Sequence, residues 1–221
     1  MENMYEDIEN KKKIFEREHW KYYLLLEKRF LNSLEYVELD MDNYNCFSME
    51  FSSLLLLVGS ELDAVFKIFC GFNVFDRKTI TDYAGYAFSN NVSDDIVNQI
   101  ILIQKYDMSI QPFRDWNCAS PAKSLEWWTA FTDIKHNRSC NLKKANLQNV
   151  LNTLGALFFI EMLYLKRITD NSEILDVFGD KSDLFLLKDW TSKAVPIEKA
   201  FECLGAYLGK TDQSSIRFDG C

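Results

Sequence analysis

Apolar residues recur three and four positions apart along most of the chain, which is the spacing of amphipathic α-helices. The longest segments with this spacing predict four main helices. These segments cover residues 3 to about 37, Ser48 to Gly71, Ser124 to Lys135 and Leu142 to Ile168. Ser48 is the expected N-cap of the second helix, which is apolar on most sides and is therefore expected to be the most buried. The pattern predicts a mainly α fold, a four-helix bundle with smaller additions.

Shorter segments predict what these additions are. A short helix is expected to follow Thr79, and a small β-hairpin or irregular insertion is expected around Ile101–Phe113. The stretch DLFLLKDW at 183–190 suggests one more strand, and Ile197–Leu208 a final short helix.

The length suits a single domain, because 221 residues are enough to bury one hydrophobic core. We expect one helical domain over residues 1–221. Its core should lie in about residues 15–168, followed by a C-terminal extension over 169–221.

The charge is uneven along the chain. The net charge of −8 argues against a general nucleic-acid binder, since phosphates would be repelled at long range. Residues 101–150 are nevertheless basic, with seven Lys and Arg against four Asp and Glu. No acid occurs between Asp133 and Glu161. Lys135, Arg138, Lys143 and Lys144 fall in this gap.

Membrane and metal chemistry have little support in the sequence. The longest apolar runs, LLLLV and LGALFFIEMLYL, are shorter than the roughly 18–20 residues that a membrane span needs. No secretory signal pattern opens the chain, so we expect a soluble, cytoplasmic protein with no membrane partner. The six cysteines form no CxxC pair and there are two histidines, so we expect neither a metal nor another cofactor.

The stretch IKHNRSCN, at 134–141, carries the candidate chemistry. Residues two apart on a helix point about 200° apart, so His136 and Arg138 converge only if the backbone turns at Asn137 or Arg138. This stretch is poor in helix formers, and Asn tolerates helix-ending conformations. We therefore expect a turn here, with Asn141 as the N-cap of the next helix.

The turn would gather positive charge around an imidazole. Lys143 and Lys144 would fall in the first turn of the next helix, where cations and free amides together make an anion site. We expect His136, which stands between Lys135 and Arg138, to act as a general base. A base and cations are what metal-independent RNA cleavage needs. The alternative is that His136 packs at a helix end and the cations are simply solvated.

The layout resembles the HEPN superfamily of helical-bundle proteins. The likeness lies in the apolar helix with LLLLVGSELDAVFK and in the polar turn KHNR, which precedes ANLQNVLNTLGALFFIEML. It covers roughly residues 15–168 in arrangement, and only 127–158 is specific. The resemblance implies a homodimer in which two copies of the turn meet. It also implies either a metal-independent endoribonuclease of toxin–antitoxin or antiphage systems, or an inactive binding module.

The resemblance is only partial at the catalytic motif, in which an Arg precedes the His by four to six intervening residues. No Arg stands at those positions here, so only His136 carries over, with Arg138 following it as the candidate cation. We expect Lys135, Asn137, Lys143 and Lys144 to bind the substrate. Glu61 either supports the motif as a nearby acid or has an edge or capping role. The rival function is a non-catalytic interaction module that binds a basic protein partner through the acidic N-terminal helix.

Overall fold

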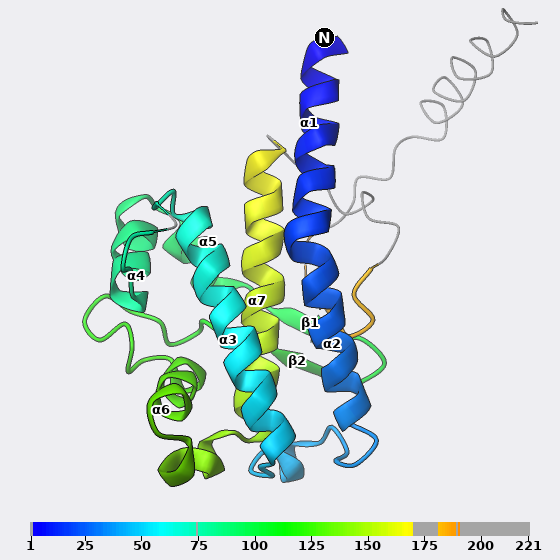
Figure 1. Ribbon diagram of the computed structural model, residues 1–221, viewed down its shortest axis with the longest axis vertical. Helices are drawn as coiled ribbons and strands as arrows, with labels where there is room; N and C mark the ends of the chain where they lie inside the picture. The colour runs from blue at the N-terminus through cyan, green and yellow to red at the C-terminus, as the bar shows by residue number, and fades with distance from the viewer. Residues whose placement is uncertain (1, 74, 170–180, 189, 191–221) are drawn as a thin grey trace, which may run out of the picture. The chain divides into compact units, whose positions relative to one another are not determined.

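The long periodic segments form helices in the computed structural model of the chain, which describes residues 2–73, 75–169, 181–188 and 190 (Figure 1). The fold is mainly helical with one small antiparallel sheet. The α-helices are α1 (Glu2–Phe15), α2 (Lys21–Ser33), α3 (Met49–Phe69), α4 (Ile80–Ser89), α5 (Ser93–Asn98), α6 (Glu126–Asn141) and α7 (Leu147–Ile168). The described residues belong to one unit that extends from Met1 to Trp190.

The predicted first helix is a continuous helical path that changes type in the middle. A π-helical segment, η1 (Glu16–Trp20), joins α1 to α2. The periodicity does not reveal this segment, because a single wide turn hardly disturbs a three-four spacing. Such π-turns are rare and are often found at functional sites. The helical path ends at Ser33, earlier than the expected residue 37.

Helices α3 and α7 pack together along most of their length and form the centre of the fold (Figure 1). Ser48 caps α3 as predicted, since its Oγ accepts a hydrogen bond from the amide of Phe51 at 3.0 Å. The prediction that this helix is the most buried is wrong. In α7, 16 of 22 residues are buried, against 10 of 21 in α3.

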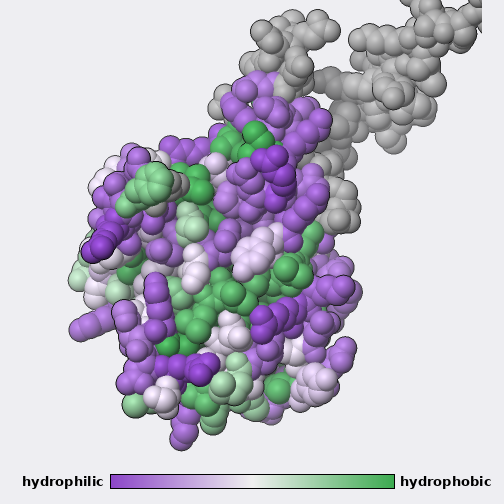
Figure 2. Space-filling model, in the orientation of Figure 1, coloured by the Kyte–Doolittle hydropathy of each residue, from purple (hydrophilic) through white to green (hydrophobic). Residues whose placement is uncertain are grey.

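The outer face of α3 stays in contact with solvent. Met49 and Leu57 are exposed there, and Leu25 is exposed on the neighbouring α2. Figure 2 shows a band of apolar surface across this face of the molecule.

Helix α6 approaches α3 closely at Gly59. A Cβ at this position would lie 2.4 Å from Cδ2 of Phe131, so no larger residue fits without movement of the ring. Gly155 on α7 has a similar role towards the hairpin, where a Cβ would lie 2.5 Å from Cδ1 of Ile110. The two glycines let neighbouring elements pack closely against the central pair of helices.

The sheet contains the predicted hairpin and one further strand. Strands β1 (Ile101–Ile103) and β2 (Met108–Ile110) are antiparallel, and β3 (Phe185–Leu187) pairs with the other edge of β1. The strand expected in DLFLLKDW is therefore confirmed. A short helix, α5, was not predicted, and the expected helix at Ile197–Leu208 lies outside the described residues.

Glu27 holds the strand β3 segment against α2. Its carboxylate is buried and accepts hydrogen bonds from the Tyr23 hydroxyl at 2.5 Å, the Asp183 amide at 2.9 Å and the Ser182 hydroxyl. This buried acid is thus fully partnered, as buried polar groups usually are. Among the described helices, none combines the length and the apolar character needed to cross a membrane.

Candidate functional site

The chain turns at Asn137, one of the two positions that the sequence predicts. Asn137 has φ −151° and ψ 79°, which breaks the helical path inside α6. Its side-chain oxygen accepts hydrogen bonds from the Ser139 hydroxyl at 2.9 Å and the Cys140 amide at 3.4 Å. The carboxamide therefore stabilises the chain just after the turn, in the way that an N-cap residue does. His136 and Arg138 stand on either side of this kink.

The candidate residues of this turn differ in what they contact. His136, Arg138 and Lys143 are exposed, and within the described part of the chain no side chain makes a hydrogen bond or ion pair with any of them. Lys135 lies over the ring of Phe131, with its Nζ 5.4 Å from the ring centroid. We call residues 135–144 the basic turn.

Lys144 is neutralised, because it forms an ion pair with Asp133. The predicted position of the next helix is also wrong. Helix α7 begins at Leu147 and is capped by Asn146, whose side chain accepts from the amide of Asn149 at 2.9 Å. Asn141 instead donates to the carbonyl oxygen of Asn137 at 2.9 Å.

Lys143 and Lys144 consequently lie in a 3₁₀ turn, η3 (Leu142–Lys144), and not in the first turn of α7. The amides at the start of α7 do not add to an anion site at these lysines. The basic turn is therefore a solvated surface with excess positive charge.

Glu61 is not part of the basic turn. Its Oε1 lies 3.3 Å from Nδ1 of His19, a histidine to which the sequence assigned no role. Both side chains are largely buried, with exposed fractions of 18% for Glu61 and 12% for His19. His19 belongs to the π-helical segment and also packs edge-on against the ring of Tyr164. The π-turn therefore places His19 between α3 and α7.

Glu161 is the most unusual group near this pair. Its side chain is fully buried in α7, and no group in the described part of the chain forms a hydrogen bond with either carboxyl oxygen. Burial is the main cause that raises the pKa of Glu161 well above its usual value, and the negative charge of Glu61 adds to it. The sequence contained the signal for this group, since Glu161 interrupts an otherwise apolar run. Its lack of a partner depends on the packing and was not predictable.

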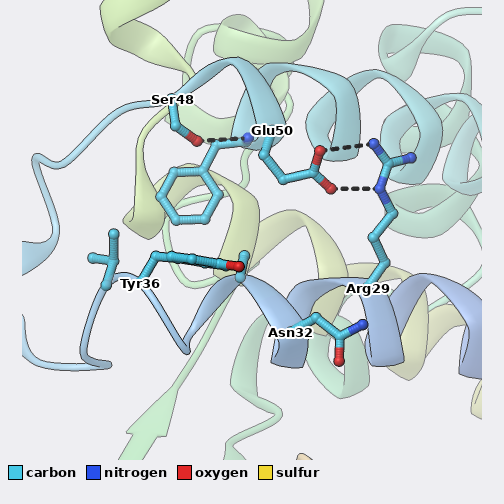
Figure 3. Close-up of a pocket in the computed structure, with 8 residues that line it drawn as sticks. Arg29, Asn32, Tyr36, Ser48 and Glu50 are labelled. Atoms are coloured by element: carbon cyan, nitrogen blue, oxygen red, sulfur yellow. Dashed lines mark hydrogen bonds and ion pairs between the residues drawn. The ribbon is translucent and has the colours of Figure 1, made fainter.

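A pocket of about 450 Å³ opens between the end of α2 and the start of α3 (Figure 3). Arg29 and Glu50 form a two-point ion pair across it, with Arg29 Nη2 2.9 Å from Glu50 Oε2. This pair lowers the pKa of Glu50 and raises that of Arg29. Asn32 and Tyr36 line the pocket on the α2 side, and the Tyr36 side chain is 86% exposed. No pattern in the sequence predicts this pocket, because it forms only where the end of α2 meets the start of α3.

The pocket and the basic turn lie at the same end of the helical body. Ser48, which lines the pocket, donates its amide to the carbonyl oxygen of Ala145 at 3.4 Å, and Ala145 directly follows the basic turn. Two further backbone hydrogen bonds join the same segments, from Leu147 to Cys46 at 2.9 Å and from Gln148 to Tyr44 at 3.2 Å.

Within the described residues, no group of three or more His, Cys, Asp or Glu side chains is placed to hold a metal ion. His19, Glu61 and Glu161 therefore do not form a metal centre in this arrangement. Comparisons of the chain with protein families, with curated proteins and with solved structures find no match.

Proposed function

We propose that this protein is a cytoplasmic, HEPN-like four-helix-bundle protein that binds single-stranded RNA through the basic turn. We propose that it acts in bacterial defence or stress. The observation that carries the proposal is the kink at Asn137, which leaves His136 and Arg138 exposed beside Lys135 and Lys143. Cations that are exposed and not paired with acids are available to phosphates, and such contacts supply most of the affinity of non-specific RNA binding. The acidic charge elsewhere confines this binding to one surface.

The test is the affinity for a short single-stranded RNA, measured by fluorescence anisotropy at two salt concentrations. The test variant replaces Lys135, Arg138 and Lys143 with Gln. The control variant replaces three exposed lysines elsewhere in the described chain with Gln: Lys105, Lys123 and Lys181. Both variants lose the same net charge, so long-range repulsion is matched.

We expect the basic-turn variant to bind at least about tenfold more weakly in about 50 mM salt, while the control binds like the native protein. The affinity of the basic-turn variant should also depend less on salt. For single strands, each lost phosphate contact reduces the slope of log binding constant against log salt concentration by about 0.7. Equal loss in both variants would show that only net charge matters and would refute the site.

Metal-independent RNA cleavage is the second candidate function. It is favoured by the positions of His136 and Arg138, which are exposed on the two sides of the kink with no acid bound to either in the described chain. His136 would act as the base and Arg138 would stabilise the developing charge, with a second copy of the chain completing the site. Cleavage of RNA in the presence of a chelator, lost in His136→Ala, would support it. Equal background cleavage by the native protein and by His136→Ala would exclude the nuclease activity.

The exposed apolar side chains of Leu25 on α2 and of Met49 and Leu57 on α3 support the proposed homodimer. The rival interaction module would use α1, whose described side chains are mostly exposed. Several charges of α1 are paired within the helix, for example Lys11 with Asp7 at 2.6 Å, which leaves less of them for a basic partner. Light scattering on the native protein and on Leu57→Glu tests the homodimer. If the native protein is a dimer and Leu57→Glu is a monomer, the chain self-associates through α3. If the native protein is itself a monomer, the homodimer is excluded.

A further inference from the structure

The pocket between α2 and α3 has the properties of a site for a small, planar and uncharged polar group. Its volume of about 450 Å³ is within the range of ligand sites in proteins. Arg29 and Glu50 neutralise each other through their two hydrogen bonds, so the pocket presents polar atoms without net charge. A phosphate or a carboxylate would have to compete with Glu50 for the guanidinium. The pocket therefore suits a neutral ligand better than an anion.

Two residues on the α2 side offer the contacts that a nucleobase uses. Tyr36 is 86% exposed, which is unusual for a large aromatic residue and leaves its ring accessible for stacking. Asn32 is exposed as well, and its carboxamide carries a hydrogen-bond donor and an acceptor side by side. Figure 3 shows both side chains opposite Ser48 and Glu50, across the pocket. Stacking together with an amide that reads a base edge is a common mode of single-stranded RNA recognition.

The position of the pocket links it to the basic turn. Ser48 forms part of its wall and is hydrogen-bonded to Ala145, the residue after Lys144. A strand whose phosphates lie along the basic turn would pass the end of α3, where the pocket opens.

From this arrangement we infer that the pocket between α2 and α3 binds one nucleobase of the RNA strand, stacked on Tyr36 and hydrogen-bonded by Asn32. The inference rests on the proposed RNA binding, and it adds a contact to a base of the RNA. It assigns two separate tasks, with phosphates held by the basic turn and a base held by the pocket.

The experiment compares short RNA oligomers of about eight nucleotides with an abasic oligomer that has the same backbone. Anisotropy is measured for the native protein, Tyr36→Ala, Tyr36→Phe and Asn32→Ala. Tyr36→Phe keeps the ring and is the matched control. Because Tyr36 and Asn32 are exposed, these variants should melt at the native temperature, which circular dichroism checks.

Tyr36→Ala should bind the normal oligomer about tenfold more weakly, and Tyr36→Phe should bind it like the native protein. The native protein should bind the abasic oligomer as weakly as Tyr36→Ala binds the normal one. If the native protein binds RNA but tolerates both Tyr36→Ala and the loss of the bases, the pocket has no role and this inference is overturned alone. If the native protein binds no RNA, the proposed function fails and the inference fails with it.

Discussion

Replacement of Glu161 by Met should stabilise the protein, although it changes a fully buried residue of the central helix. Among the described residues, none forms a hydrogen bond with either carboxyl oxygen of Glu161, so folding removes these oxygens from water without compensation. An unsatisfied buried polar group costs about 1–3 kcal/mol. Met has a similar size and shape without this cost, so we expect Glu161→Met to raise the free energy of unfolding by about 1–3 kcal/mol at low pH.

The gain should become larger as the pH rises. The pKa of Glu161 is higher in the folded protein than in the unfolded chain, because burial and then the charge of Glu61 disfavour the ionised form. The folded state therefore holds a proton that the unfolded state releases once the pH exceeds the carboxyl's ordinary value. Native stability is lost over that interval, at about 1.4 kcal/mol per pH unit, until the pH passes the folded pKa. Glu161→Met has no such proton and escapes this loss.

Urea unfolding followed by circular dichroism at several pH values between about 4 and 8 measures both effects. Glu161→Gln keeps buried polar atoms but cannot ionise. Its free energy of unfolding should therefore equal that of the native protein at low pH and exceed it increasingly as the pH rises. A Glu161→Met protein that is less stable than the native protein at every pH would refute the reasoning. It would mean that the carboxyl has a bound partner whose loss costs more than burial.

Three further outcomes follow from the packing. Glu27→Ala should lower the free energy of unfolding by about 3 kcal/mol, since it leaves two buried hydroxyls without their acceptor, and hydrogen exchange should accelerate first in β3. Gly59→Ala should cost about 1–3 kcal/mol because its Cβ would meet a packed ring, whereas Gly155→Ala should cost less because it meets the end of a flexible side chain; thermal melts compare them. Burial raises the pKa of Cys70 to about 12, so peptide mass spectrometry after brief alkylation near pH 8 should find Cys70 unmodified and the exposed Cys140 modified.

The periodic pattern predicts the helices well because their apolar faces must be buried whatever their partners are. The N-cap at Ser48, the strand at Phe185–Leu187 and the break at Asn137 all depend on local chemistry, and the structure contains each of them. The sequence predicts that the last long helix begins at Leu142, whereas α7 begins at Leu147. Asn146, and not the predicted Asn141, caps α7, and backbone hydrogen bonds join this start to the segment before α3. These bonds link segments that are far apart in the sequence, so the local pattern does not signal them.

The candidate site was predictable only where it depends on neighbours in sequence. The exposure of the basic turn follows from a local break, and the charge gap after Asp133 points to it. The pair of His19 and Glu61 joins residues 42 positions apart through a π-turn, and no spacing rule signals that contact. The ion pair between Lys144 and Asp133 was equally hidden, and it removes one cation from the predicted anion site.

Glu27 and Glu161 together give the strictest check on these arguments. Both are carboxylic acids buried among the same helices, so a simple rule on burial would assign them the same effect. Glu27 receives hydrogen bonds from Tyr23, Ser182 and Asp183, whereas no residue that the structure describes donates one to Glu161. The partners, and not burial, then decide the sign: removal of Glu27 should destabilise the protein and removal of Glu161 should stabilise it. The same sign for both changes would show that hydrogen-bond satisfaction does not control the stability of this core.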